Sequence, residues 1–220
     1  MPSSPQTIDA LLTRSEQIAG LTLAEIAAHL GVQLPANARK EKGWTGQLIE
    51  LWLGATAGSK PQQDFPHLGV ELKTLPIDRN GRPLESTYVC MTPLLNARGE
   101  TWQSCNVRNK LAQVLWVPIL AERAIPIAQR IVGNALLWRP SAAQETILKQ
   151  DWEELMEAVA FGQIEQLTAR HGEALQLRPK AANSQVRTKA IGPNGQIIET
   201  LPRGFYLRRS FTESLLRNYF

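Results

Sequence analysis

The chain has 220 residues, 43% of them hydrophobic, and a net charge of +4. This length and composition suit one globular core, or a core divided by a cleft. The two cysteines show neither metal-ligand spacing nor a disulfide framework, which fits a reducing compartment and small core roles. The start lacks a signal-peptide pattern, and no stretch approaches the ~20 apolar residues of a membrane span. We therefore expect a cytoplasmic protein without a membrane partner.

The first third of the chain is predicted to be helical. Apolar spacing predicts helices over about residues 6–19 and 22–30, and a third over about 45–53. The third helix carries Glu50 among apolar neighbours, where a carboxylate usually has a partner because burying an unpaired charge is costly. From the helix alone, a solvated position for Glu50 is an equally good interpretation. Residues 54–61 lack the spacing of a phosphate-binding loop, and we interpret them as a link.

The strongest candidate site follows this link. Asp64 stands seven residues before Glu71, and Lys73 comes two residues later. Residues 70–75 alternate apolar and polar, which predicts a half-buried strand with Glu71 and Lys73 side by side on one face. Gly69 allows a turn that brings Asp64 back towards Glu71. Two carboxylates and an ammonium can hold a divalent cation beside a cationic donor. For the Glu71–Lys73 pair alone, a solvated strand face is the commoner situation.

The middle of the chain is predicted to be β-rich. An Asn-Gly turn at residues 78–83 leads to a strand over 86–91, which we expect to pair with the preceding strand. Buried strands are predicted over 114–119 and 135–138. Lys110 precedes the first of these and is placed to overhang the same sheet end as the Glu71 strand, although an exposed lysine is the commoner outcome.

A long helix is predicted over about residues 141–161. Ser141 and Gln144 have capping-box spacing at its start, and Gly162 ends it. We interpret its acidic residues as a solvated face that can contact a protein partner. These residues are Glu145, Asp151, Glu153, Glu154 and Glu157.

The C-terminal part of the chain is basic. Residues 170–209 carry a net charge of +6, and the rest of the chain carries −2. Strand-like pieces alternate there with basic loops, and Phe205 and Tyr206 lie among arginines. Cations for phosphates and planar groups for base edges are what a duplex-contacting surface requires. A last helix is predicted to begin near Ser210, with a capping box to Glu213.

Several runs resemble the MutH family of mismatch-repair endonucleases, and the resemblance covers nearly the whole chain. The most specific runs are residues 42–44 (KGW), 53–60 (LGATAGSK), 64–74 (DFPHLGVELKT), 178–183 (RPKAAN) and 201–207 (LPRGFYL). The resemblance implies a mixed α/β (α+β) fold of the restriction-endonuclease type, with a central mixed sheet flanked by helices and two arms around a DNA cleft. We expect one domain over residues 1–220, with a catalytic arm roughly over 1–140 and a DNA-reading arm roughly over 141–220.

The resemblance also implies an activity and its residues. It implies Mg²⁺-dependent nicking of the unmethylated strand, 5′ to the G of hemimethylated GATC sites in double-stranded DNA, activated by the ATPase MutL. Unmethylated GATC sites are expected to bind as well. One or two Mg²⁺ ions are implied for each active site, and Mn²⁺ or Ca²⁺ can take their place. The implied catalytic residues are Asp64, Glu71, Lys73, Glu50 and Lys110, of which Asp64, Glu71 and Glu50 are the metal ligands. The implied DNA-binding residues are Lys42, Tyr88, Arg178, Pro179, Lys180 and Tyr206.

Two positions depart from the expected pattern. As is usual for this subfamily, Gln63 stands where the wider restriction class often has proline before its first acid. Tyr88 stands where we expect phenylalanine.

The expected mechanism is in-line attack of water on a phosphodiester. Asp64 and Glu71 bind the metal, Lys73 orients the water or helps to deprotonate it, and Glu50 completes a second metal position or orders a water. Tyr206 is the candidate for contact with the adenine N6 group at the major-groove edge. Cutting one strand needs one active site, so we expect a monomer, associated with the nucleoid during repair.

Two alternatives stay open. A GATC-specific restriction endonuclease would share the catalytic residues but would cut both strands without MutL. A non-catalytic DNA-binding module would keep the basic segment and need no divalent ion.

Overall fold

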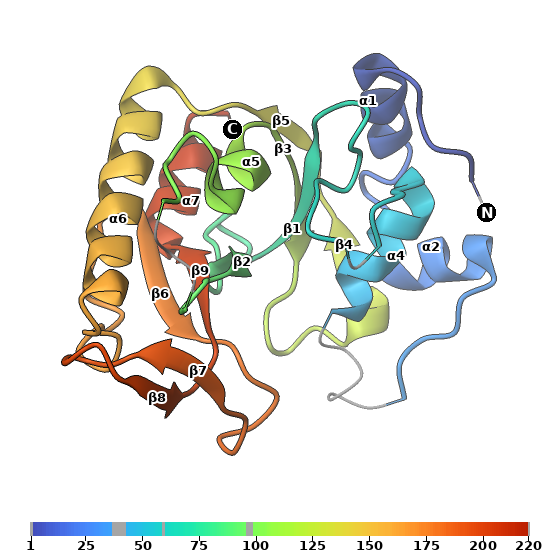
Figure 1. Cartoon of the computed structure of the whole chain (residues 1–220). Coiled ribbons are helices and arrows are strands. Elements are labelled where there is room, and N and C mark those ends of the chain that lie inside the picture. The colour runs from blue at the N-terminus through green and yellow to red at the C-terminus, as the bar shows by residue number, and fades with distance from the viewer. Residues whose placement is uncertain (1, 37–42, 59, 96–98, 220) are drawn as a thin grey trace. The chain divides into compact units, whose positions relative to one another are not determined.

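The computed structural model describes residues 2–36, 43–58, 60–95 and 99–219, and the chain forms two compact units (Figure 1). The first unit combines Met1–Leu84, Ala112–Arg139 and Tyr219–Phe220. The second combines Glu85–Leu111 and Pro140–Asn218. Both units contain helices and sheets, which confirms the predicted mixed α/β class.

The first unit is built on a mixed sheet. Strand β1 (Glu71–Ile77) pairs in parallel with β3 (Val114–Leu120), so that Glu71 lies opposite Val114. Strand β3 pairs antiparallel with β4 (Ile131–Val132) and with β5 (Leu136–Trp138). The central strand β3 is buried along almost its whole length, as its run of apolar residues predicts.

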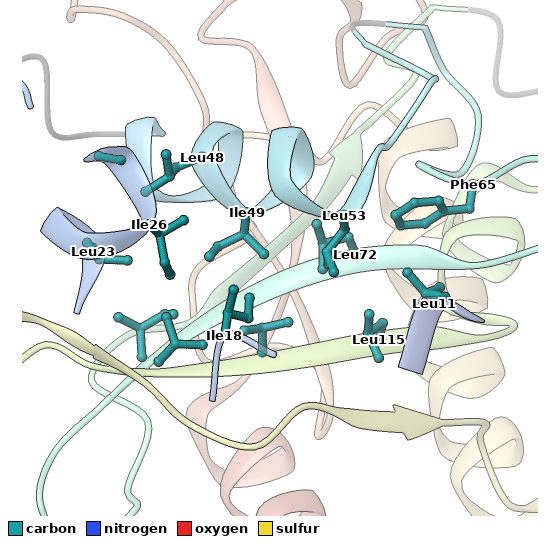
Figure 2. Close-up of a cluster of buried hydrophobic side chains, with 14 of the residues drawn as sticks. Leu11, Ile18, Leu23, Ile26, Leu48, Ile49, Leu53, Phe65, Leu72 and Leu115 are labelled. Carbon is teal, nitrogen blue, oxygen red and sulfur yellow. The ribbon is translucent and has the colours of Figure 1, made fainter. Parts of the chain in front are cut away.

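Three helices pack their apolar sides into a cluster with this sheet (Figure 2). They are α1 (Ile8–Glu16), α2 (Leu23–Leu30) and α4 (Trp44–Leu53); the short helix η1 (Ile127–Gln129) adds a buried isoleucine. The cluster includes Ile49 of α4, Leu72 of β1 and Leu115 of β3. Since side chains alternate along a strand, Leu72 marks the helix-covered face of β1, and Glu71 and Lys73 point to the opposite face.

The second unit contains two antiparallel sheets. The strands β2 (Thr87–Met91), β9 (Arg203–Leu207) and β6 (Leu175–Pro179) form one sheet in that order. The strands β7 (Thr188–Ile191) and β8 (Ile197–Thr200) form a separate hairpin. The helices are α5 (Asn106–Leu111), α6 (Ala142–Ala160) and α7 (Arg209–Arg217). Within the described part of the chain, no helix combines the length and apolar character that crossing a membrane requires.

The expected pairing of residues 86–91 with the preceding strand is wrong. Strand β2 pairs antiparallel with β9, and β1 pairs with β3. The turn after β1 forms as predicted, because Asp78 receives hydrogen bonds from the Asn80 and Arg82 amides. The returning chain makes a single isolated bridge, between Ile77 and Pro83. Pro83 has no N–H to donate, and the chain then passes into the second unit.

Of the two predicted capping boxes, one is confirmed and one is wrong. Ser141 and Gln144 form both hydrogen bonds of the predicted capping box of α6. The capping box predicted at Ser210 is wrong, since α7 begins at Arg209 with Arg208 as its N-cap, without a side-chain cap. Glu213 instead forms an ion pair with Arg217, 2.5 Å away, one turn further along the helix.

Asp151 of α6 is not part of a solvated face, so that expectation is wrong for this residue. Its side chain is buried and accepts hydrogen bonds of 2.6 to 2.8 Å from the amides of Glu173, Ala174 and Leu175. Three amide donors satisfy a buried carboxylate, which would otherwise be costly to desolvate. Asp151 thereby ties α6 to the beginning of β6. This anchor is invisible in the local sequence pattern.

Candidate functional site

The loop before β1 folds back on itself and returns Asp64 to the strand. Phe65 and Val70 pair through two backbone hydrogen bonds of 2.9 and 3.2 Å. Gly69 turns the chain with a φ of 66°, which side-chain-bearing residues rarely adopt. The Gln63 amide donates to the Gly69 carbonyl at 3.0 Å and closes the base of the loop. The turn predicted at Gly69 is therefore confirmed.

Asp64, Glu71 and Lys73 come together at the beginning of β1. The Asp64 carboxylate accepts a hydrogen bond of 2.8 Å from the Leu72 amide, next to Glu71 in the strand. Lys73 Nζ lies 2.5 Å from Glu71 Oε1. The side-by-side arrangement of Glu71 and Lys73 is therefore confirmed.

The burial of these carboxylates contradicts the ordinary surface interpretation. Asp64 is 9% exposed and Glu71 is 1% exposed, whereas a solvated strand face would leave both in water. A buried carboxylate needs an opposite charge or strong donors, and Lys73 supplies the charge to Glu71. Two carboxylates held at the beginning of the same strand are also the oxygen donors that a hard divalent cation prefers. These residues fit a divalent cation, although the described residues include no cluster of three or more potential metal ligands.

Glu50 approaches β1 from the helix-covered side. It lies on α4, and a Cβ placed on Gly46 would be 3.9 Å from both Glu50 Oε1 and Thr74 Oγ1. Thr74 follows Lys73 in the strand and, by alternation, shares the face of Leu72. Glu50 is thus close to the strand that carries Glu71, and its role at the metal stays a prediction.

Two predicted lysines cannot be joined to this site. Lys110 lies on α5 of the second unit, a helix that was not predicted from the sequence, and its catalytic role stays a prediction. Lys42 lies outside the described residues.

The other predicted DNA-binding residues meet on one face of the β2–β9–β6 sheet. The opposite face is buried and includes Leu175, Leu177, Phe205 and Leu207. Tyr206 lies opposite Tyr88 on one side and Gln176 on the other, and Arg178 lies opposite Gly204. Alternation therefore places Tyr88, Arg178 and Tyr206 on the same, more accessible face. Pro179 ends β6 and is exposed.

We call the residues Tyr88, Arg178, Lys180 and Tyr206 the aromatic–basic face. The rings of Tyr88 and Tyr206 meet edge to face with centroids 5.4 Å apart. The Arg178 guanidinium lies 5.6 Å from the Tyr206 centroid, and Lys180 Nζ lies 4.5 Å from the Tyr88 centroid. Each cation therefore sits against a ring, an arrangement that restrains both partners.

Gly204 makes room for this arrangement. A Cβ at this position would lie 2.8 Å from the Tyr88 ring, closer than side chains tolerate. Gly204 was not predicted to have a role of its own, although an isolated glycine in a strand is a recognised sign of close approach.

Burial raises the pKa of the Tyr206 hydroxyl; the nearby Arg178 charge lowers that pKa and partly offsets this effect, and Glu85 raises it further. Tyrosine already titrates near pH 10 in water, so this hydroxyl keeps its proton at neutral pH. It can therefore donate a hydrogen bond to a base edge as well as accept one.

The basic segment does not act as one surface. Arg203 is buried, with Nη2 3.7 Å from Glu165 Oε2, and Glu165 also accepts a hydrogen bond from Thr200. Arg208 donates to the carbonyls of Ala169 and His171 at 2.7 and 3.1 Å. These two arginines are therefore engaged within the unit, although the sequence shows them only as members of one basic segment.

Comparison with known proteins gives a consistent result. The family model described as "DNA mismatch repair enzyme MutH" matches residues 53–151. The DNA mismatch repair protein MutH of Vibrio cholerae (strain O395) is 57% identical over 220 residues, covering 100% of both chains. The MutH protein of Klebsiella pneumoniae strain 342 is 56% identical and covers 100% of this chain and 95% of its own. That of Escherichia coli K12 (DH10B) is 55% identical over 218 residues, covering 99% and 95%.

A mixed α/β fold, a paired acidic site with an adjacent lysine, and these relatives define the chain as a DNA-repair endonuclease. The resemblance seen in the sequence is confirmed, and with it the prediction of an endodeoxyribonuclease. The chain belongs to the MutH family of DNA mismatch repair enzymes.

Proposed function

We propose that this enzyme nicks the unmethylated strand at hemimethylated GATC sites, 5′ to the G, in a Mg²⁺-dependent reaction that MutL activates. The observation that carries the proposal is the convergence of Asp64, Glu71 and Lys73. Asp64 accepts from the Leu72 amide at 2.8 Å, and Glu71 is paired with Lys73 at 2.5 Å. The names of the relatives support a role in mismatch repair.

Asp64 and Glu71 would hold the divalent cation, with Glu50 completing a second position or ordering a water. When bound, the cation neutralises charge on the scissile phosphate and makes an attacking water more acidic. One or two Mg²⁺ ions fit the proposal, and Mn²⁺ or Ca²⁺ can occupy the same oxygen donors.

Lys73 acts on the water and on the developing negative charge. Its ammonium lies 2.5 Å from Glu71 on the same face of β1, so it would reach the reacting phosphate already oriented. A positioned cation stabilises the negative charge that grows on the phosphate in the transition state. We propose that Lys110 adds a further positive charge.

The aromatic–basic face reads the DNA in this proposal, together with Lys42 and Pro179. Arg178 presents a planar guanidinium, which can donate two hydrogen bonds to a guanine edge, and Lys180 suits a phosphate. Tyr206 keeps its hydroxyl proton and can contact the adenine N6 group, where methylation would change the contact.

We further propose a cytoplasmic monomer, associated with the nucleoid during repair, because nicking one strand needs one active site.

A single domain of two arms, roughly 1–140 and 141–220, remains our prediction. The β2 strand, which carries Tyr88, lies in the same compact unit as Arg178 and Tyr206.

The decisive test is a strand-resolved nicking assay on a hemimethylated GATC duplex, with each strand labelled separately. We expect cleavage of the unmethylated strand only, dependent on Mg²⁺ and faster with MutL. Rapid cleavage of both strands without MutL would instead identify a restriction endonuclease.

A Ca²⁺ titration of the wild type and of Asp64→Asn tests the metal site separately. We expect calorimetric heat from the wild type and a much weaker signal from Asp64→Asn. Equal binding by the two proteins would remove Asp64 from the metal site.

A further inference from the structure

Strand β2 contains an irregularity beside the aromatic–basic face. Tyr88 lies opposite Tyr206, and Cys90 lies opposite the next residue of β9, Phe205. Two steps along β2 therefore match one step along β9, which leaves Val89 as the extra residue of a β-bulge. Val89 and Cys90 are both buried. Bulges re-aim the side chains that follow them.

The bulge changes the side of the sheet on which Met91 emerges. Met91 comes three residues after Tyr88, so in a regular strand it would point to the opposite, buried face. With it, Met91 lies opposite Gly204, which shares the face of Tyr206. Met91 is 46% exposed, whereas Cys90 and Thr92 on either side are buried. An apolar side chain is thus placed on the accessible face.

The neighbours of Met91 are the residues of the proposed reading face. Gly204 of the central strand β9 separates Met91 on β2 from Arg178 on β6, because both lie opposite it. Gly204 has no side chain to stand between them. The Tyr88 ring covers the same glycine. Met91 therefore borders the two groups, guanidinium and phenol, that suit base edges.

We propose that Met91 is a specificity-determining residue that makes an apolar contact with the C5-methyl group of a thymine in the GATC site. In an A·T pair the thymine methyl and the adenine N6 group lie along the same major-groove edge. A face that presents Tyr206 to adenine N6 therefore also meets a thymine methyl, and Met91 is its exposed apolar side chain. A thioether is flexible and polarisable, which suits contact with a methyl group.

This inference rests on the proposed function of the aromatic–basic face, and its test separates the two. The probe is a hemimethylated GATC duplex in which either thymine of the site is replaced, one at a time, by deoxyuridine, which lacks only the methyl group. Nicking by the wild type and by Met91→Ala is measured as kcat/KM on the thymine and the uracil duplexes. Both proteins are assayed under identical salt and MutL concentrations.

We expect the effects of Met91→Ala and of the thymine-to-uracil replacement on kcat/KM not to be additive. At one of the two thymines, uracil lowers kcat/KM of the wild type about four-fold, the value of one buried methyl group. Met91→Ala lowers kcat/KM on the thymine duplex by a similar factor and is then insensitive to uracil. An equal uracil effect in both proteins, at both thymines, overturns the inference.

Two further variants complete the design. Met91→Leu keeps an apolar side chain and should retain the sensitivity to uracil. Ile197→Ala removes a 59%-exposed apolar side chain from β8, outside this sheet, and should leave kcat/KM unchanged on every duplex. If Arg178→Ala nicks every duplex as the wild type does, the proposed reading face itself is wrong. If only the Met91 cycle fails, the reading face stands and Met91 has no part in it.

Discussion

At the residue scale, Glu71 is more deeply buried than Asp64 or Lys73. Its side chain is 2% exposed, and Lys73, itself only 15% exposed, lies 2.5 Å away. The loss of one partner of a buried ion pair is costly because it leaves the other charge uncompensated. The pair therefore links the chemistry of the site to the stability of the first unit.

We expect Lys73→Met to abolish nicking and to lower the free energy of unfolding by about 3 kcal/mol in the absence of divalent cations. Urea denaturation followed by circular dichroism measures the second effect. The double variant Glu71→Gln/Lys73→Met should regain most of the stability, because both charges are removed, but none of the activity. Equal stabilities of Lys73→Met and the wild type would contradict the buried ion pair.

Tyr206 provides a prediction on pH dependence. Burial raises the pKa of its hydroxyl, so the phenol stays neutral throughout the range from pH 7 to 9. Preference for unmethylated over fully methylated duplexes should therefore be constant over this range. Tyr206→Phe should lower that preference by about ten-fold, the value of roughly 1.4 kcal/mol for one hydrogen bond. Nicking rates on the two duplexes at pH 7 and 9 give the answer.

The same pKa has a consequence for stability. A folded-state pKa above the unfolded value contributes stability below about pH 10 that is lost as the pH rises further. In Tyr206→Phe this part of the alkaline loss of stability should be missing. Chemical denaturation at pH 9 and 11 compares the two proteins.

At the element scale, one buried carboxylate holds the beginning of a strand. Asp151 binds three consecutive amides at the beginning of β6, the strand that carries Arg178. We expect Asp151→Asn to cost about 2 kcal/mol of unfolding free energy, since hydrogen bonds to a charged acceptor are the strong ones. Glu153→Gln changes an exposed acid on the same helix and should stay within about 0.5 kcal/mol of the wild type. Similar costs for the two variants would rule out an anchoring role.

The end of α4 provides a second test at this scale. Gly54 has a φ of 79°, and a Cβ there would lie 2.8 Å from the Ser3 carbonyl oxygen and 2.9 Å from Arg14 Nη1. That arginine joins the N-terminal segment to the helix through hydrogen bonds to the carbonyls of Ser3 and Leu53.

A left-handed alanine alone costs about 1 kcal/mol of unfolding free energy, and Gly54→Ala should cost more than this because its Cβ also meets Ser3 and Arg14. Gly58→Ala is the matched control, because Gly58 also has a positive φ but has open space around its Cβ position. Thermal unfolding of the two variants separates the close contact from the backbone strain. Equal shifts in Tm would show that the chain near Ser3 moves away without cost.

At the scale of the whole molecule, the charge distribution predicts the salt dependence of DNA binding. Arg178 is exposed on the aromatic–basic face, whereas Arg208 is engaged with backbone carbonyls. Each phosphate contact contributes about −0.9 to the slope of log K against log salt. Arg178 reads a base in our proposal, so Arg178→Ala should lower the affinity with little change in the slope; a slope reduced by about 0.9 would show that Arg178 contacts a phosphate instead.

Arg208→Gln should leave the slope unchanged and lower the stability instead. Fluorescence anisotropy with a labelled GATC duplex at several salt concentrations measures all three proteins. A reduced slope for Arg208→Gln would show that this arginine contacts DNA despite its internal hydrogen bonds.

Local sequence patterns predicted much of the structure. The alternation around Glu71 predicted a strand with Lys73 on the same face, and the glycine at position 69 predicted the turn that returns Asp64. Capping signals located the beginning of α6 correctly. These features depend on neighbours within a few residues, so the sequence contains all the information that they need.

Helix α5 was missed because its local signal is weak, and the other failures have a common origin in distant contacts. Helix α5 is only six residues long and lacks a strong periodic pattern. Asp151 resembles a surface acid until its partners, more than twenty residues away, are known. Arg203 and Arg208 resemble free cations for the same reason. Burial is a property of the assembled unit and cannot be read from a residue and its sequence neighbours.

The sequence by itself therefore determined the family, the strand of the acidic site and the side chains that perform the proposed chemistry. Only the tertiary structure decided that β2 pairs with β9 and that a bulge places Met91 beside Tyr88, Arg178 and Tyr206. The physical reason is the separation along the chain between the residues that interact. Turns, caps and alternation follow from local backbone geometry, whereas strand pairing and burial follow from which distant segments exclude water together.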